Sequence, residues 1–176
     1  MKIICISGKG RHGKDTSAEY IKPILERKGY KVLITHYGDL VKYTCKTFFG
    51  WDGVKDEKGR HILQYVGTDI IRNQDQNFWV DYIVDILSFF KNEWDYVLIP
   101  DCRFPNEIEK LKEKGFDVCS LRVNRINFKS DLTEEQLAHI SETALDNYHF
   151  DYVVFNDKLD DFYNKLSLLV NDIVTK

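Results

Sequence analysis

The sequence predicts an α/β fold in which a five-stranded parallel sheet forms the middle of a three-layer α/β/α sandwich. Five short apolar runs alternate along the 176 residues with longer segments whose apolar residues recur at helical spacing. Parallel strands need a crossover between them, so this alternation indicates a sheet covered by helices on both faces, with right-handed connections. No linker or internal repeat interrupts the pattern, and we expect a single domain over residues 1–176.

The strand-like runs are short and dominated by apolar residues. They cover residues 3–6, 32–34, 94–100, 118–123 and 152–155. The carboxyl ends of parallel strands meet at one edge of the sheet, which is where ligands bind in open α/β folds. Polar residues that follow these runs are therefore the candidates for a functional site.

Helical segments connect the strand runs. The first is expected from Gly13 to Lys28-Gly29, with a kink or an early end at Pro23. A capping box opens a helix expected over residues 133–145. Residues 50–59 are expected to form a mobile surface loop. The other expected helices cover residues 40–49, 62–71 (one helix or a pair), 79–90, 106–114 and 159–173.

The composition limits the classes of function. The net charge of −3 argues against a protein that coats nucleic acid. The four cysteines lack metal-type spacing and are expected to be reduced core residues of a cytoplasmic protein. No apolar run approaches the ~18 residues of a membrane span and no signal peptide is visible, so we expect no membrane partner.

The most informative stretch lies between the first strand run and the first helix. It reads G-K-G-R-H-G-K-D-T over residues 8–16 and contains the P-loop pattern G-x-x-x-x-G-K. The amides of such a loop and the start of its helix offer donors to a phosphate chain, and Lys14 adds a full positive charge. We expect the phosphate chain to be bound by Gly8, Gly10, Arg11, His12, Gly13 and Lys14.

Asp15 departs from the usual P-loop, in which Ser or Thr follows the lysine and holds a metal ion. Either Asp15 ligates Mg²⁺ directly or through water, or Thr16 takes over that task. Alternatively, Asp15 is simply a first-turn residue favoured by the helix dipole. The sequence alone leaves these alternatives open.

Charged residues at the strand ends offer the positioning and charge neutralisation that phosphoryl transfer requires. Asp101 ends the third run and could hold Mg²⁺, accept a proton, or be a turn residue. Arg103 could clamp a phosphate or pair with Asp101 or Glu107. Arg122 and Arg125 end the fourth run, and Arg125 is the better candidate for a lid arginine unless both are solvated surface residues.

Other polar residues are weaker candidates. Arg72, in the helical region, could reach the phosphate of an acceptor. Asn156-Asp157 follows the fifth run, where a purine could be contacted, but the order Asn-Lys-x-Asp of a GTPase is missing. His139, Ser141 and Glu142 are expected on the solvated face of a helix.

Several motifs occur together in one order along the chain. They are Gly-Lys-Asp-Thr at 13–16, Gln-Tyr-Val-Gly-Thr-Asp-Ile at 64–70 with Phe-Trp-Val at 78–80, Pro-Asp-x-Arg at 100–103, His-x-Ser-Glu at 139–142 and Asn-Asp at 156–157. In this combination the chain resembles the bacteriophage-type deoxynucleoside monophosphate kinases of the P-loop nucleoside and nucleotide kinase superfamily. In that family an aspartate follows the P-loop lysine, so Asp15 is not an anomaly there.

The resemblance implies a fold, a reaction and site residues. The fold would be that of a P-loop NTPase with a mobile acceptor-side segment at about residues 37–75 and a short lid at about residues 125–148. The reaction would transfer the γ-phosphate of ATP, with Mg²⁺, to a deoxynucleoside 5′-monophosphate. The metal would be arranged by Asp15, Thr16 and Asp101, and ATP would also contact Arg122, Asn156 and Asp157. The acceptor would contact Asp39, Lys42, Gln64, Arg72 and Arg103. The catalytic residues would be Lys14, Asp101, Arg103 and Arg125.

Alternatives remain open from the sequence. One is another small-metabolite kinase, resembling phosphomevalonate kinase or dephospho-coenzyme A kinase. Another is a non-catalytic module that uses a bound nucleotide as a conformational signal, while a DNA-associated ATPase is disfavoured by the acidic composition. The sequence does not decide which base is accepted, whether ribose is excluded, or whether two chains form a homodimer.

Overall fold

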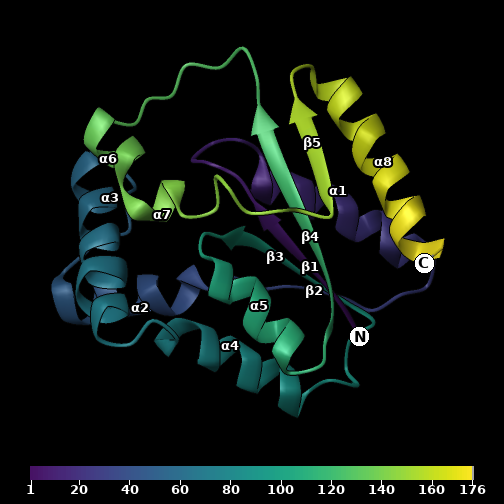
Figure 1. The fold of residues 1–176 in the computed structure, drawn as a ribbon, viewed down its shortest axis with the longest axis horizontal. Helices are drawn as coiled ribbons and strands as arrows, with labels where there is room; N and C mark the ends of the chain where they lie inside the picture. Colours follow the sequence, from purple (N-terminus) through teal and green to yellow (C-terminus); the bar gives the residue numbers. More distant parts are fainter. Residues whose placement is uncertain (176) are drawn as a thin grey trace.

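The computed structural model of the chain describes residues 1–175 and has the predicted sheet. Five parallel strands pair in the order β2-β3-β1-β4-β5, and helices cover both faces (Figure 1). The strands are β1 (Lys2–Ser7), β2 (Val32–Ile34), β3 (Tyr96–Cys102), β4 (Asp117–Arg125) and β5 (Tyr152–Asn156). Within residues 1–175, no helix has the length and apolar character needed to cross a membrane.

Strand β1 lies in the middle of the sheet, between β3 and β4. Ser7, at its carboxyl end, is opposite both Cys102 of β3 and Arg122 of β4. The strand order changes direction here, so the loop after β1 lies at the topological switch point, where open α/β sheets bind ligands.

The sheet divides the main core in two, because successive side chains of a strand point to opposite faces. On one face Ile4 and Ile6 pack with two helices, and on the other Ile3 and Cys5 pack with another two. The helices of the first face are α1 (Lys14–Arg27) and α8 (Leu159–Thr175), and those of the second are α4 (Phe78–Phe89) and α5 (Pro105–Glu113).

Helix α1 continues through Pro23 to Arg27, so it does not end early at the proline. Ile21 and Leu25, on either side of Pro23, are fully buried in the core. Packing of this apolar face therefore outweighs the hydrogen bond that the proline cannot make.

A third, smaller core lies in the segment that follows β2. Cys45, Trp51 and Val66 form its buried centre. The expected loop over residues 50–59 is shorter than predicted, because a helix has already begun and buries Gly59. The elements of this segment are α2 (Gly38–Phe49), α3 (Glu57–Gln64) and the π-helix η1 (Tyr65–Arg72).

The helix expected over residues 133–145 is interrupted at His139, whose backbone is extended. The two pieces are α6 (Glu134–Ala138) and α7 (Ile140–Thr143). The His139 ring accepts a hydrogen bond from the N–H of Ser141, which caps α7. Helix α6 lies beside α3 (Figure 1), and Gln136 donates a hydrogen bond at 3.4 Å to the carbonyl of Glu57.

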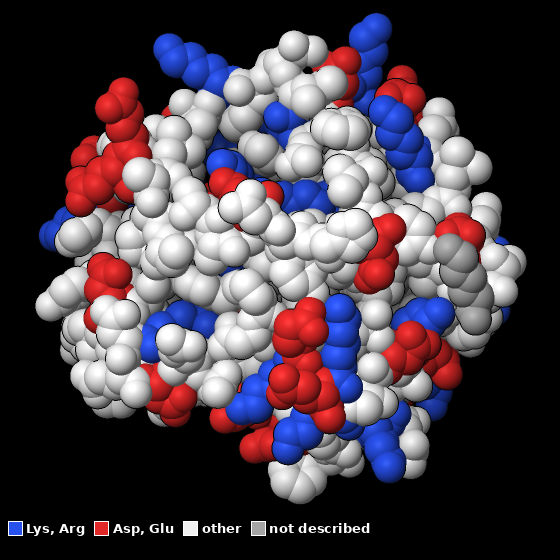
Figure 2. Space-filling view, viewed as in Figure 1, with Lys and Arg blue, Asp and Glu red and all other residues white. Residues whose placement is uncertain are grey.

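The surface and the cysteines agree with the composition. Lys and Arg are interspersed with Asp and Glu over the face shown in Figure 2. The four cysteines are free thiols, and three of them are buried: Cys5, Cys45 and Cys102, with Cys119 partly exposed.

Candidate active site

The loop between β1 and α1 has a backbone that requires its glycines. Gly13 has a φ of 103°, a left-handed conformation that other residues rarely adopt. Gly8 lies so close to β4 that a Cβ would stand 2.5 Å from the carbonyl oxygen of Val123. Asn156 of β5 donates a hydrogen bond at 3.0 Å to the carbonyl of His12, so Asn156 supports the shape of the loop.

Lys14 is the first residue of α1 and is buried beneath this loop. Its Nζ donates a hydrogen bond at 2.9 Å to the carbonyl of Lys9. Burial lowers the pKa of Lys14 to about 7, and the nearby guanidinium of Arg103 acts in the same direction. A negative phosphate would oppose this effect, so a bound anion favours the protonated form of Lys14.

A cavity of about 450 Å³ adjoins the loop and brings half of the expected residues together. Its lining includes Gly10, Arg11, Lys14, Asp15, Lys42, Gln64, Arg72, Asp101 and Arg103. The expected residues outside the lining are Gly8, His12, Gly13, Thr16, Asp39, Arg122, Arg125, Asn156 and Asp157. One cavity thus joins the P-loop lysine to the arginines and polar residues expected on the acceptor side.

Asp101 links the end of β3 to the start of α2. Its Oδ1 accepts a hydrogen bond from the N–H of Tyr37 at 3.0 Å, and its Oδ2 accepts one from the N–H of Gly38 at 2.8 Å. The carboxylate therefore holds the third core against the edge of the sheet. A contact of Asp101 with metal or substrate remains a prediction.

Asp15 lies exposed at the start of α1 and pairs with His36, with 3.2 Å between Oδ1 and Nε2. The other ring nitrogen of His36 lies 3.4 Å from Asp39, which also pairs with Lys42 at 2.7 Å. The hydrogen bond between Asp15 and His36 raises the pKa of the histidine and lowers the pKa of the carboxyl. These four side chains form a charged row from the P-loop to the acceptor side.

The carboxylates of the cavity fit a substrate-bound magnesium ion. Within residues 1–175 no cluster of three Asp, Glu, His or Cys side chains could hold a metal unaided. Mg²⁺ commonly uses one or two carboxylates together with waters and substrate phosphates. Asp15 and Asp101 supply two carboxylates to one cavity lining, whereas Thr16 is half-buried outside it.

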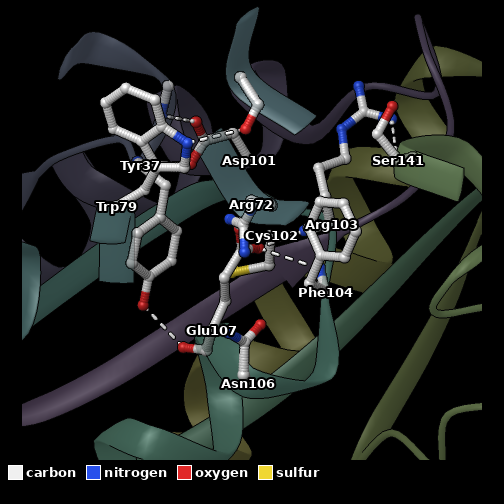
Figure 3. Close-up of polar contacts among 12 residues, drawn as sticks. Tyr37, Arg72, Trp79, Asp101, Cys102, Arg103, Phe104, Asn106, Glu107 and Ser141 are labelled. Carbon is white, nitrogen blue, oxygen red and sulfur yellow. Dashed lines mark hydrogen bonds and ion pairs between the residues drawn. The ribbon is translucent and has the colours of Figure 1, made fainter. Parts of the chain in front are cut away.

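A buried ion pair between Arg72 and Glu107 forms part of the cavity wall (Figure 3). Glu107 also accepts hydrogen bonds from the N–H groups of Arg103 at 2.5 Å and Phe104 at 3.1 Å. The Phe104 ring covers the Arg72 guanidinium at 4.1 Å, and the carbonyl of Gln76 accepts from that guanidinium at 3.1 Å. Burial raises the pKa of Glu107 to about 7, against the opposing effect of Arg72. Glu107 therefore fixes the Arg72 side chain and the Arg103 backbone.

The sequence singled out Glu107 only as one partner that Arg103 could have. The available signal is a glutamate at the third position of a helix that begins at Pro105. A carboxylate at this position reaches back to the N–H groups that precede the helix. Its additional contact with Arg72 joins two segments that lie 35 residues apart and leaves no local pattern.

The guanidinium of Arg103 pairs with Glu142 of α7 and donates to the carbonyl of Ser141 at 3.3 Å. The other carboxylate oxygen of Glu142 accepts a hydrogen bond from the N–H of Gly10 at 2.8 Å. Glu142 is buried and lines the cavity. The expectation of a solvated face is wrong for Glu142, because the interruption at His139 leaves α7 facing the P-loop.

Arg122 and Arg125 of β4 lie in different surroundings. Arg122 is buried, donates to Ser7 Oγ at 3.0 Å and pairs with Asp146 at 2.8 Å. Arg125 is exposed and donates to the carbonyl of Arg11 at 3.4 Å. Arg125 is therefore next to the P-loop, while the Arg122 guanidinium is already occupied by other side chains.

A P-loop kinase is defined by the parallel sheet, the P-loop after its central strand, the buried Lys14 and the arginines that line the same cavity. The sequence pattern of the deoxynucleotide monophosphate kinase family matches residues 54–166, which is more than half of the chain. The chain belongs to this family and is an ATP-dependent phosphotransferase. The resemblance found in the sequence is confirmed, although the matched range begins after the P-loop.

Individual relatives agree with the family. A protein of Acanthamoeba polyphaga mimivirus, assigned as a deoxynucleotide monophosphate kinase, is 28% identical over 200 residues, which cover 98% of this chain and 97% of the relative. The deoxynucleotide monophosphate kinase of Enterobacteria phage T4 is 33% identical over 110 residues, which cover 61% of this chain and 43% of the phage enzyme.

A solved structure shares the fold. A mutant of the APS kinase CysC of Mycobacterium tuberculosis matches with a TM-score of 0.51 at 12% identity, over 99% of this chain and 97% of that chain. The α/β fold predicted from the sequence is confirmed by this likeness and by the parallel sheet itself.

Proposed function

We propose that the chain transfers the γ-phosphate of ATP to a deoxynucleoside 5′-monophosphate. The observation that carries the proposal is a single cavity whose lining includes Lys14, Arg72 and Arg103. Two phosphorylated molecules can meet there, because the lining places more than one cationic group around one space. Membership of the deoxynucleotide monophosphate kinase family supports this choice of acceptor.

In the proposed reaction, an oxygen of the acceptor phosphate forms a bond to the γ-phosphorus while the bond to the β–γ bridging oxygen breaks and ADP leaves. Lys14 and the loop amides bind the phosphate chain of ATP. Arg72 holds the acceptor phosphate, and Arg103 lies between the two phosphates. Their fixed charges stabilise the negative charge that spreads over the transferring group. Arg125, beside the loop, is the candidate to close over this group from the lid.

Mg²⁺ is part of the proposal. Asp15 and Asp101 would hold the ion, with Thr16 as the alternative on α1. When bound, it supplies positive charge that neutralises the phosphate oxygens.

Two segments are proposed to move around the rigid sheet. The acceptor-side segment, residues 37–75, is supported by its separate core. The lid, residues 125–148, is supported by the position of α6 and α7 between the P-loop and the third core. Such movements commonly exclude water from phosphoryl-transfer sites. A cytoplasmic location is also proposed, supported by the four free thiols.

Coupled ADP release, measured with each common nucleoside and deoxynucleoside monophosphate, tests the proposal. Phosphomevalonate and dephospho-coenzyme A serve as competing acceptors. We expect turnover with at least one deoxynucleotide and its loss in Lys14→Ala, with the fold retained by circular dichroism. Turnover with phosphomevalonate or dephospho-coenzyme A alone, or ATP binding without acceptor-stimulated turnover, would refute the proposal.

A further inference from the structure

Glu142 contacts two groups that the proposed reaction assigns to phosphates. One carboxylate oxygen accepts the N–H of Gly10 at 2.8 Å, and the other pairs with the guanidinium of Arg103. Gly10 belongs to the loop whose amides cradle a phosphate chain, and guanidinium groups bind carboxylates and phosphates in the same way. The Glu142 carboxylate thus has the partners that a phosphate group would take.

The residues around Glu142 hold it in a fixed position. The residue is only 9% exposed and lines the cavity. A Cβ on Gly10 would lie 2.9 Å from Leu132 and 3.9 Å from Glu142 Oε2, so the lid segment packs directly on the P-loop. At the N-cap of α7, the His139 ring lies 3.2 Å from Asp69 of η1. Helix α7 therefore connects the P-loop to the acceptor side.

A phosphate chain in the P-loop and the Glu142 carboxylate are both negative. They compete for the same N–H and the same guanidinium, and they repel each other in a poorly solvated cavity. The carboxylate must therefore give up its bond to Gly10 when the phosphates take their places.

We propose that Glu142 is an internal substitute for a substrate phosphate, which keeps Gly10 and Arg103 in place before nucleotide binds and is displaced when nucleotide enters. This inference rests on the proposed function, since it takes the P-loop to be the phosphate site. Displacement of Glu142 moves α7, and the contact between His139 and Asp69 carries that movement to the acceptor side. Glu142 is thus a positioning residue whose displacement couples the two substrate sites.

Binding of inorganic tripolyphosphate, measured by calorimetry, tests the inference without requiring turnover. Glu142→Gln retains the size of the side chain but removes its charge. Because hydrogen bonds to charged groups are roughly twice as strong as neutral ones, we expect tripolyphosphate to bind Glu142→Gln about five- to thirtyfold more tightly than the unmodified chain. The matched control is Glu135→Gln, an exposed glutamate of α6, for which we expect no change.

The outcomes separate the inference from the proposed function. Equal or weaker binding by Glu142→Gln would show that Glu142 is a permanent clamp on the loop, and would refute the inference alone. If the unmodified chain bound neither tripolyphosphate nor ATP, the proposed function and the inference would both be refuted.

A second measurement uses the unmodified chain and does not depend on the folding of a variant. In a crystal structure with a non-hydrolysable ATP analogue, we expect the bond between Glu142 Oε2 and the N–H of Gly10 to be absent, with an analogue phosphate oxygen bonded to that N–H. Retention of the 2.8 Å bond beside a bound phosphate chain would overturn the inference.

Discussion

At the scale of single residues, burial sets the charges of the cavity. Burial moves the pKa of Lys14 down to about 7 and the pKa of Glu107 up to about 7. The directions are opposite because a poorly solvated site favours the neutral form of a base and of an acid alike. Both groups are therefore sensitive to the charge of an incoming substrate.

ATP binding should be coupled to proton uptake by Lys14. Burial lowers the pKa of this lysine to about 7, and a bound phosphate would move it back towards its ordinary value of 10.5. At pH values below the lowered pKa, Lys14 is already protonated before ATP binds. ATP affinity then does not change with pH through this group. Above the lowered pKa, affinity falls by up to about tenfold per pH unit, because each binding event must add a proton.

Calorimetry about one pH unit above that pKa, in buffers of different ionisation enthalpy, measures the protons taken up. We expect a net uptake that disappears in Lys14→Ala under conditions where the variant still binds ATP. Equal uptake by the variant and the unmodified chain would assign the proton to another group.

Replacing Glu107 by glutamine should weaken acceptor binding more than the chemical step. The change removes the charge that pairs with Arg72, so the arginine loses its fixed position. We expect the acceptor KM to rise about tenfold or more with a smaller change in kcat, and the free energy of unfolding to fall by about 3 kcal/mol because a buried charge loses its partner.

The matched control for this change is Glu113→Gln, at the exposed end of the same helix. Steady-state kinetics and urea denaturation should leave it indistinguishable from the unmodified chain. A fall in kcat at constant acceptor KM in Glu107→Gln would instead place Glu107 in the chemical step.

The sequence best predicts the positions of residues that belong to a local pattern. Gly13 and Lys14 follow from a pattern of seven residues, and Asp101 follows from its place at a strand end. Glu142 could not be predicted as a cavity residue. Its burial depends on an interruption at His139 and on an arginine that lies 39 residues away in the sequence.

At the scale of elements, the P-loop depends on backbone conformations that only glycine adopts readily. Gly13→Ala should reduce both stability and ATP affinity. The backbone at φ 103° is strained for alanine, and its Cβ would lie 2.8 Å from Asn156 Nδ2. We expect the free energy of unfolding to fall by about 1–3 kcal/mol.

Gly29 offers a matched control, since its φ is 92° but nothing lies within 4 Å of its Cβ position. Gly29→Ala should cost about 1 kcal/mol and leave ATP affinity unchanged. Denaturation and nucleotide titration of the two variants separate the strain from the effect on the site. If the variants bound ATP equally well, the P-loop would not depend on Gly13.

Elements with a strong period were predictable, and so was the capping box at the start of α6, but the interruption at His139 was not. All five strands were found because buried parallel strands are nearly continuous apolar runs. The interruption between α6 and α7 has no such signal, since the capping box at residue 133 and the apolar spacing suit one long helix. The π-helical form of η1 likewise leaves no signal in the sequence, because its longer period cannot be told from that of an α-helix over only eight residues.

At the scale of the whole molecule, the central strands of the sheet are buried on both faces. Leu98 and Ile99 are neighbours on β3 but belong to different cores, and both are fully buried. Leu98→Ala and Ile99→Ala should each lower the free energy of unfolding by about 2–5 kcal/mol, because each removes packed volume that the surroundings cannot refill.

Val153 of β5, which is 50% exposed, provides the comparison. Val153→Ala should cost less than about 1 kcal/mol in the same denaturation experiment. If Leu98→Ala or Ile99→Ala lowered the free energy of unfolding as little as Val153→Ala, one face of the sheet would not be a true core.

Residues 37–75 have a small core of their own, while Tyr37 and Arg72 tie the segment to the rest of the fold. Asp101 anchors this segment through two main-chain contacts, at Tyr37 and Gly38, which do not depend on the side chains of those residues. Mutations within this small core can change which acceptor is preferred, while the residues that bind ATP change independently. A chimera that carries the corresponding segment of a relative should inherit that relative's base preference and keep its own way of holding ATP.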